Sequence, residues 1–479
     1  MRTLLVYITM DLAAFSACAN FPRLVGPTYF RLHRRLMPHV ALVSFSGLRV
    51  REERLAEMGV RLPGLAARAT AIRQLPSLGL LTLAGMLPDD WTCSYREAET
   101  VDEAFVESLV RERPRLVAMS SLTASVQQAY ALAGMVRAEG VPTVLGGLHA
   151  TTCSKDATTQ VDAVCLGEGE LVWRQVLADA EAGCLQSKYS AVRTAGEIAW
   201  PLPRFDLIAD RPVVRWTVQT QRGCPLACEF CAASRLISRF REKPTSRVRE
   251  ELAAIRQLDP QPVVELADDN TFAGPRDAEP LLEALREADI RYFTEVDWRI
   301  GEQPALAAGL AASGCVQVLL GIESMVFRYP GMGAKDVSLT RIMDAVDRIQ
   351  DAGVAVIGCF IVGADGETRE SLDRLADFIH HSRLADVQIT LHTPFPGTPL
   401  RRRLDRAGRL LEKRDWSHYT LFDVTFQPDQ MSVSELEDGF SALLCEVFEN
   451  NEAGRRAAIR REVWRRNPVL RGRAWQPTM

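Results

Sequence analysis

The sequence of 479 residues lacks any long apolar run. No stretch approaches the ~20 consecutive apolar residues that a membrane-spanning helix needs, so we expect no membrane span. Charge of one sign is also scarce: 57 basic and 61 acidic residues leave a formal charge of only −4, which gives no overall attraction to nucleic acid. Low-complexity segments are absent too, and a composition with 47% hydrophobic residues is that of a globular protein with large cores.

A disulfide framework is also missing. The eleven cysteines are scattered and odd in number, which is typical of a protein from a reducing compartment. The apolar run Thr3–Met10 follows a single arginine and is interrupted by Asp11, which disfavours a secretory signal. We therefore expect a cytoplasmic protein in which residues 1–39 form an N-terminal extension.

Residues 40–185 alternate between short apolar segments and amphipathic ones. This alternation predicts an α/β domain of the doubly wound, Rossmann-like type, with a parallel sheet covered by helices on both faces. Ligands of such sheets bind at the carboxyl ends of the strands. The predicted strands are 40–46, 91–95, 115–121, 142–145 and 163–167, and the predicted helices are 78–87, 101–111, 127–139 and 171–182.

Small and hydroxyl-bearing residues follow three of these strands. They are Ser120-Ser121-Leu122, Gly146-Gly147 and Gly167-Glu168-Gly169-Glu170. Residues of this kind let a large planar or phosphate-bearing ligand approach the backbone amides. Each segment alone is an ordinary turn signal, but three at one sheet edge predict a binding site.

The second half of the chain repeats the strand–helix alternation six times. Before it, residues 186–212 are loosely patterned and punctuated by prolines, as in a linker between domains. Six βα units in residues 213–400 predict a partial version of the eight-unit TIM-like barrel, with its chemistry at the carboxyl ends of the strands. The predicted strands are 213–220, 262–267, 290–296, 316–322, 354–362 and 387–391, and the predicted helices are 247–257, 278–287, 302–312, 340–352 and 371–380.

Residues 401–479 are predicted to form a C-terminal helical tail. The tail is rich in arginine, but glutamates are mixed among the arginines. This mixture indicates a solvated helix face or a contact with the rest of the chain, and no nucleic-acid partner is expected.

Three closely spaced cysteines, Cys224, Cys228 and Cys231, follow the first strand of the predicted barrel. Cysteine thiolates hold iron–sulfur clusters, and a [4Fe–4S] cluster held by three of them has one iron without a protein ligand. The amino and carboxylate groups of a methionine could bind that iron. A structural zinc site is the alternative, but it needs four ligands, and no fourth cysteine or histidine lies in this loop.

The spacing Cys-x3-Cys-x2-Cys, with Phe230 just before the third cysteine, resembles that of the radical S-adenosylmethionine superfamily. The resemblance implies that the three cysteines are catalytic, and that a partner such as flavodoxin or ferredoxin donates electrons. His392 and Phe395, after the sixth strand, are placed to face a substrate. The further contacts that the resemblance implies are Asp268, Asp269 and Asn270 for the methionine amino group, Glu323 for the ribose, and Ile361 and Gly363 for the adenine.

The first half of the chain resembles the cobalamin-binding domain found ahead of many radical S-adenosylmethionine domains. Ser120 and Leu122 look like its Ser-x-Leu element, and Gly146 and Gly147 like its Gly-Gly element. The Asp-x-His-x-x-Gly motif, whose histidine binds cobalt in the wider family, is absent. His149 lies in a different loop and is interpreted as a hydrogen-bonded loop histidine. The resemblance implies cobalamin held without a histidine on cobalt, and a degenerate domain that binds nothing stays open.

Together these features predict a radical S-adenosylmethionine enzyme with a [4Fe–4S] cluster and cobalamin. The first hypothesis is methylation of an unactivated carbon of a small molecule or natural-product intermediate. The second is a radical cyclisation, rearrangement or other group transfer without methylation. A third is a non-enzymatic iron–sulfur sensor, which the set of barrel-mouth residues disfavours.

Overall fold

The computed structural model describes residues 37–45, 50–62, 76–191, 199–211, 215–232, 236 and 239–470. From Pro38 onward the chain forms one compact unit. The predicted N-terminal extension lies almost entirely outside the described residues, as do parts of the predicted linker. None of the helices in the described ranges is both long enough and apolar enough to cross a membrane.

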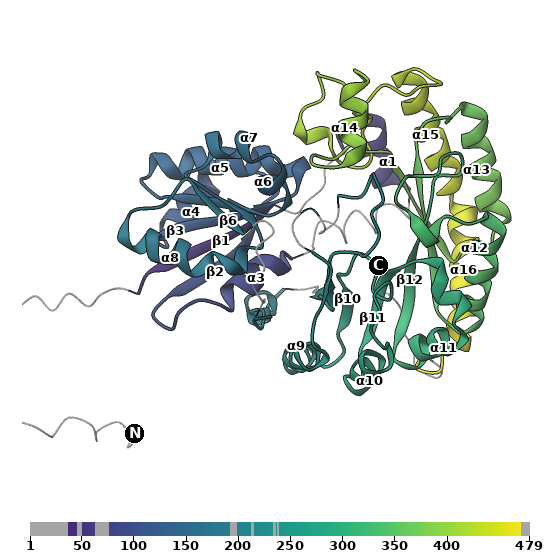
Figure 1. Cartoon of the computed structure of the whole chain (residues 1–479), viewed down its shortest axis with the longest axis horizontal. Coiled ribbons are helices and arrows are strands. Elements are labelled where there is room, and N and C mark those ends of the chain that lie inside the picture. Colours follow the sequence, from purple (N-terminus) through teal and green to yellow (C-terminus); the bar gives the residue numbers. More distant parts are fainter. Residues whose placement is uncertain are drawn as a thin grey trace, which may run out of the picture. The chain divides into compact units, whose positions relative to one another are not determined.

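Six parallel strands form the first sheet (Figure 1). Their order is β2-β1-β3-β4-β5-β6, so the chain reverses direction across the sheet between β1 and β3, which is the switch point where ligands of doubly wound sheets bind. The strands are β1 His39–Phe45, β2 Thr92–Glu97, β3 Leu116–Ser121, β4 Thr143–Gly146, β5 Ala163–Gly167 and β6 Lys188–Ala191. The helices of this half are α1 Glu53–Arg61, α3 Leu78–Ala84, α4 Glu103–Val110, α5 Val126–Ala138, α6 Leu148–Thr152, α7 Ser154–Gln160 and α8 Trp173–Ala182.

Alternate residues of these strands enter two separate cores. On β1, Ala41 and Val43 pack with α4, α5 and α7, whereas Val40 and Leu42 pack with α3 and α8 on the opposite face. Because both faces are covered, the strand is apolar throughout rather than alternating. The predicted doubly wound domain is therefore confirmed.

The structure adds a strand inside the predicted linker. Residues Lys188–Ala191 form β6, which pairs in parallel with β5 at the edge of the sheet. Lys188 and Ser190 are exposed while Tyr189 and Ala191 are buried, as expected for a strand with one solvated face.

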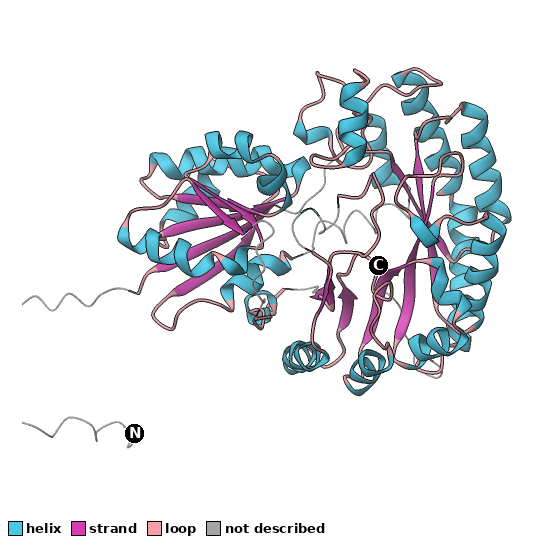
Figure 2. Cartoon of the chain, viewed as in Figure 1, coloured by secondary structure: helices cyan, strands magenta, loops and turns pink. Residues whose placement is uncertain are grey.

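The second sheet also has six parallel strands, in the order β14-β13-β12-β11-β10-β7. Successive strands are neighbours, and Figure 2 shows helices along the outer side of the sheet, as in the predicted partial barrel. The strands are β7 Trp216–Val218, β10 Val263–Leu266, β11 Arg291–Val296, β12 Cys315–Glu323, β13 Ala355–Val362 and β14 Asp386–Leu391. The helices are α9 Thr245–Leu258, α10 Glu279–Glu287, α11 Pro304–Ala312, α12 Leu339–Asp351 and α13 Arg369–His381.

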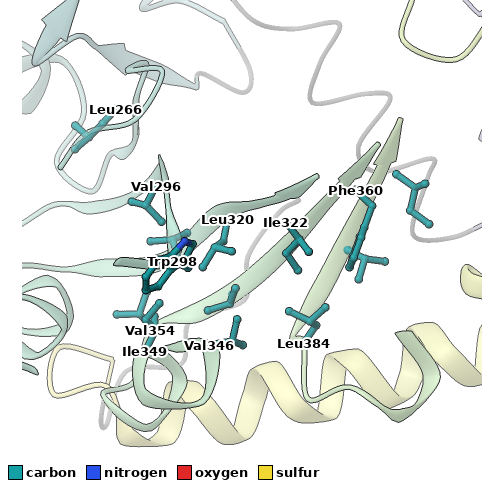
Figure 3. Packing of buried hydrophobic residues seen from close by; sticks show 14 of the residues in the cluster. Leu266, Val296, Trp298, Leu320, Ile322, Val346, Ile349, Val354, Phe360 and Leu384 are labelled. Atoms are coloured by element: carbon teal, nitrogen blue, oxygen red, sulfur yellow. The ribbon is translucent and has the colours of Figure 1, made fainter. Parts of the chain in front are cut away.

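The two faces of this sheet have different tasks. On β12, Leu320 and Ile322 point outward and pack with Val346 and Ile349 of α12, as Figure 3 shows. The alternate residues of β12, which include Leu319 and Glu323, line a cavity inside the barrel. The outer face therefore holds the helices, and the inner face is left for function.

The C-terminal residues pack on the barrel. Helices α14 (Pro399–Arg406), α15 (Val433–Val447) and α16 (Asn450–Arg466) follow the last strand. On α16, Arg460 forms an ion pair with Asp386 of β14 at 3.1 Å, and the side chain of Arg456 is buried. These two tail arginines are thus used in contacts within the chain.

Candidate active site

Cys224, Cys228 and Cys231 line one cavity of about 350 Å³ at the carboxyl ends of the barrel strands. Their loop begins after the two-residue strand β8 (Gln221–Arg222), which pairs with β9 (Arg241–Glu242). Gly223 has a φ of +73°, a left-handed conformation that glycine adopts without strain and that turns the chain into the cysteine loop.

The cysteine loop is fixed by the segment that follows β12. The Ala227 amide donates to the Gly331 carbonyl at 3.1 Å, and the Glu229 amide donates to the Pro330 carbonyl at 2.9 Å. The Phe230 ring packs on the Tyr329 ring, with 4.6 Å between their centroids. The loop is therefore held by backbone and ring contacts before any cluster is bound.

The three thiols suit a cluster better than a single ion. Among the described residues, no three His, Cys, Asp or Glu side chains are placed to hold one metal ion. In a [4Fe–4S] cluster each thiolate binds a different iron, so its ligands surround a volume and do not meet at a point. Burial raises the pKa of the Cys224 and Cys228 thiols, and the neighbouring Lys335 ammonium opposes that rise. Three thiols at the rim of one cavity fit the cluster.

The predicted acidic segment after β10 divides between two roles. The Asp268 carboxylate points into the fold and accepts from the Thr220 amide at 2.7 Å and the Gln221 amide at 3.0 Å. It therefore joins the ends of β7 and β10 and does not line the cavity. Asp269 and Asn270 do line it, and the Asn270 amide donates to Asp297 at 2.8 Å.

Glu323 ends β12 and lines the cavity beside Lys335. The two side chains form an ion pair at 2.7 Å. Burial disfavours the Lys335 ammonium, but the Glu323 carboxylate more than compensates and raises the pKa of Lys335. Glu323 has a φ of +70°, which is unfavourable for a residue with a side chain and is found mainly where function requires it. Gly321 makes room, since a Cβ there would lie 2.3 Å from a Glu323 carboxylate oxygen.

Glu295 on β11 also lines the cavity, and the sequence analysis missed it. Its side chain is accessible from the cavity, and no hydrogen bond to its carboxylate is found among the described residues. Desolvation, together with the carboxylates of Glu265, Asp269 and Glu323, raises the pKa of Glu295 to about 8. The only early signal was an acidic residue near the end of an otherwise apolar strand.

His392 and Phe395 line the cavity, as the sequence suggested. The Tyr329 hydroxyl lies 2.7 Å from His392 Nδ1, and the two rings stack with an interplanar angle of 20°. Burial and the Arg403 guanidinium lower the pKa of His392 to about 3. The imidazole is therefore neutral and belongs to the same ring stack as Phe230.

The adenine elements of the prediction separate in the structure. Ile361 lines the cavity, whereas Gly363, with a φ of +85°, packs against Leu436 of α15 and lies outside it. The Gly363 amide donates to Glu367 at 3.2 Å. The remaining cavity residues that the sequence did not indicate include Lys335, Cys359, Gln388, Thr390 and Leu421.

A second cavity of about 300 Å³ lies at the carboxyl ends of the first sheet. Ser120, Gly146 and Gly147 line it, as predicted, but Leu122 does not and has an exposed side chain. A Cβ on Gly147 would lie 3.4 Å from the Ser120 hydroxyl, so larger residues here would narrow the space. The glycine lining fits a bulky ligand that approaches the backbone.

His149 lies outside this cavity and is fully buried. Its Nε2 is 3.2 Å from the Tyr130 hydroxyl, and Trp416 packs edge-on against its ring. Burial lowers the pKa of His149 to about 4, so the imidazole is neutral. The structure places it as a hydrogen-bonded core histidine, in agreement with the interpretation from the sequence.

The two cavities meet at Arg222. Arg222 lines the first-sheet cavity two residues before Cys224, and its guanidinium pairs with Glu170 and, at 3.7 Å, with Glu168. Glu168 also pairs with Arg241 of β9, and the Arg222 guanidinium lies 5.0 Å from the Trp200 ring centroid. The acidic segment after β5 therefore contacts the strand that leads into the cysteine loop.

Comparisons with known families agree with both halves. Residues 64–177 match the model of the B12 binding domain, and residues 218–379 match the model of the radical SAM superfamily. The chain belongs to the cobalamin-binding-domain radical S-adenosylmethionine enzymes. Enzymes of this family use a [4Fe–4S] cluster, S-adenosylmethionine and cobalamin, and both cavities fit these groups.

Relatives and solved structures of this family cover most of the chain. Bacteriochlorophyllide d C-12(1)-methyltransferase of Chlorobaculum tepidum is 26% identical over 348 residues, which are 70% of this chain and 75% of the relative. The structure of the cobalamin-dependent radical enzyme OxsB with aqua-cobalamin and S-adenosylmethionine bound has a TM-score of 0.62 at 14% identity, over 84% of this chain and 66% of that chain. The methyltransferase TsrM from Kitasatospora setae has a TM-score of 0.58 at 13% identity, over 84% and 85%.

Proposed function

We propose that the protein is a C-methyltransferase that adds a methyl group to an unactivated carbon of a small molecule. The observation that carries the proposal is that one loop serves both cavities: Arg222 lines the first and Cys224 the second. A substrate between them would meet both cofactors. Methyltransferase activity in the printed names of similar proteins supports the same conclusion.

The bound cofactors supply, between them, a radical that removes a hydrogen atom and a methyl group that replaces it. The chain's own part is to hold and shield them. Cys224, Cys228 and Cys231 would hold the cluster, with one iron left for the methionine end of S-adenosylmethionine. Asp269 and Asn270 would orient the methionine amino group.

Other cavity residues would position the nucleoside. Glu323, held by Lys335, would accept hydrogen bonds from the ribose, and Ile361 would pack beside the adenine. The Asp268 carboxylate would act indirectly, because its hydrogen bonds fix the strand end from which Asp269 projects. Phe395 and Leu421 would exclude water from the space above.

Ser120, Gly146 and Gly147 would contact the corrinoid in the first cavity. No histidine lines this cavity among the described residues, so the chain would hold cobalamin without an imidazole on cobalt. We also propose a cytoplasmic setting, because an exposed iron of a cluster needs reducing conditions, and an electron donor of the flavodoxin or ferredoxin type.

A substrate-free assay separates the three functions considered. The anaerobically reconstituted and reduced holoenzyme is mixed with S-adenosylmethionine, and the products are quantified. A methyltransferase should release S-adenosylhomocysteine, up to one per bound cobalamin, together with slow formation of 5′-deoxyadenosine. A non-methylating radical enzyme would form only 5′-deoxyadenosine, and a sensor would form neither; either result would contradict the proposal. With an acceptor present, the product mass should increase by one CH₂ unit.

A further inference from the structure

The cavity of the first sheet runs inward along one face of the strands. Its lining residues come in pairs two positions apart, which therefore point to the same side of the sheet. The pairs are Ala118 and Ser120 on β3, Val144 and Gly146 on β4, and Cys165 and Gly167 at the end of β5. Two residues of a strand span about 7 Å, so the cavity is a slot that extends this far from the strand ends into the domain.

The two ends of the slot differ in chemistry. The outer end carries the polar and charged groups of Ser120, Glu168, Glu170 and Arg222. The inner end is bounded by apolar or small side chains and by α3 and α8; its residues are Leu80, Ala118, Val144, Cys165 and Trp173. An apolar slot of this kind suits a flat ring.

Trp173 gives the inner end one polar group. It is the first residue of α8, and its side chain is only 2% exposed. The indole N–H is buried, and no acceptor for it is present among the described residues. Buried tryptophan N–H groups normally have a partner, because an unsatisfied buried donor costs free energy. Of the unpartnered buried side-chain atoms in the described part of the chain, this is the one whose residue lines the slot.

We infer that the slot receives the nucleotide tail of the corrinoid and that the Trp173 N–H donates a hydrogen bond to that tail. The inference rests on the proposed use of cobalamin. A corrin ring with its amide side chains is larger than a cavity of about 300 Å³, so only a projecting part of the cofactor can enter. The tail has a planar aromatic base for the apolar walls and ribose and phosphate oxygens that can accept from the indole. The slot thus selects complete cobamides over corrinoids without a tail.

The test measures binding to the full-length apoprotein, with aquacobalamin and with cobinamide, which lacks the nucleotide tail. Equilibrium dialysis with absorbance detection gives a Kd for each ligand. The wild type should bind aquacobalamin more tightly than cobinamide. Trp173→Phe keeps an aromatic ring but removes the N–H, and should weaken aquacobalamin binding by about five- to tenfold, with cobinamide binding unchanged.

Trp91→Phe is the matched control. Trp91 is buried in the same core as Trp173 but does not line the slot, so its replacement should leave the ratio of the two Kd values unchanged. Equal weakening of both ligands by Trp173→Phe would assign the residue to packing alone and overturn the inference. Equal wild-type affinity for both ligands would also overturn it. If the wild type binds neither corrinoid, the cofactor assignment fails as well, and this result is distinct from the other two.

Discussion

Gly331 packs so closely against the carbonyl of Ala227 that a Cβ on Gly331 would lie 2.0 Å from that oxygen. The contact joins the segment after β12 to the loop that carries the cluster cysteines. Gly331 also has a φ of +83°, so two features of one residue require glycine. The cysteine loop is therefore shaped by a residue more than a hundred positions away.

Gly331→Ala should displace the cysteine loop and reduce the iron bound after reconstitution to a small fraction of the wild-type content. The matched control is Gly333→Ala, because Gly333 has a φ of +56° but its Cβ would lie 3.7 Å from its nearest neighbour. That control should cost about 1 kcal/mol of stability from the left-handed backbone and should keep its iron. The measurement is iron and sulfide per chain, and equal iron in the two variants would contradict the role of the contact.

Cys228→Ala should abolish formation of 5′-deoxyadenosine, because two thiolates do not hold the cluster in place. The control is Cys184→Ala, an exposed cysteine of the first domain, which should behave as the wild type. The checks are the visible absorption of the cluster and chromatography of the nucleoside product. A Cys228→Ala protein that still forms 5′-deoxyadenosine would exclude the proposed cluster ligands.

Binding of S-adenosylmethionine should release a fraction of a proton at pH 7. The pKa of Glu295 is raised to about 8, so its carboxyl group is mostly protonated below that pH in the ligand-free protein. A sulfonium cation in the same cavity favours the ionised carboxylate and lowers this pKa, which releases the proton. Proton release should therefore be largest near neutral pH and disappear well above pH 8, where Glu295 is already ionised.

Calorimetry in two buffers with different ionisation enthalpies measures the protons released. Glu295→Gln should remove most of the buffer dependence, whereas Glu283→Gln, an exposed position on α10, should retain it. A Glu295→Gln protein that releases as many protons as the wild type would show that another group titrates.

Arg222 and Glu170 should be strongly coupled. Both side chains are largely buried, with 14% and 11% exposure, so loss of either leaves a charge without its partner. In a double-mutant cycle of Arg222→Met and Glu170→Gln, the coupling energy should be about 1–3 kcal/mol by urea unfolding. The exposed pair Arg204 and Asp206 gives the control cycle, which should yield less than about 1 kcal/mol. Similar values for both pairs would show that Arg222 acts as an ordinary surface charge.

The regular elements could be predicted because local patterns determine them. β5 is an apolar run with polar neighbours, and the structure confirms its predicted bounds, Ala163–Gly167. β6 could not be predicted, because four residues with two polar side chains give a weak pattern. Its conformation depends on pairing with β5, a contact that local sequence does not contain.

The site was predictable where a motif states the chemistry and less so where direction matters. The cysteine spacing identified the cluster loop. Asp268 and Asp269 are adjacent, yet one points into the fold and the other into the cavity, which depends on the point where β10 ends. Lys335 lies in a loop twelve residues after Glu323, and only the folded chain brings the two together.

Arg222 limits how freely the two halves of this protein can be exchanged. It belongs to the barrel by sequence, yet it forms part of the wall of the other domain's cavity and pairs with that domain's acidic segment. A chimera with the first domain of a relative would need matching carboxylates at the positions of Glu168 and Glu170. Without them, the graft would place an unpaired guanidinium beside the corrinoid, so domain exchange in engineering must treat this junction as a single unit.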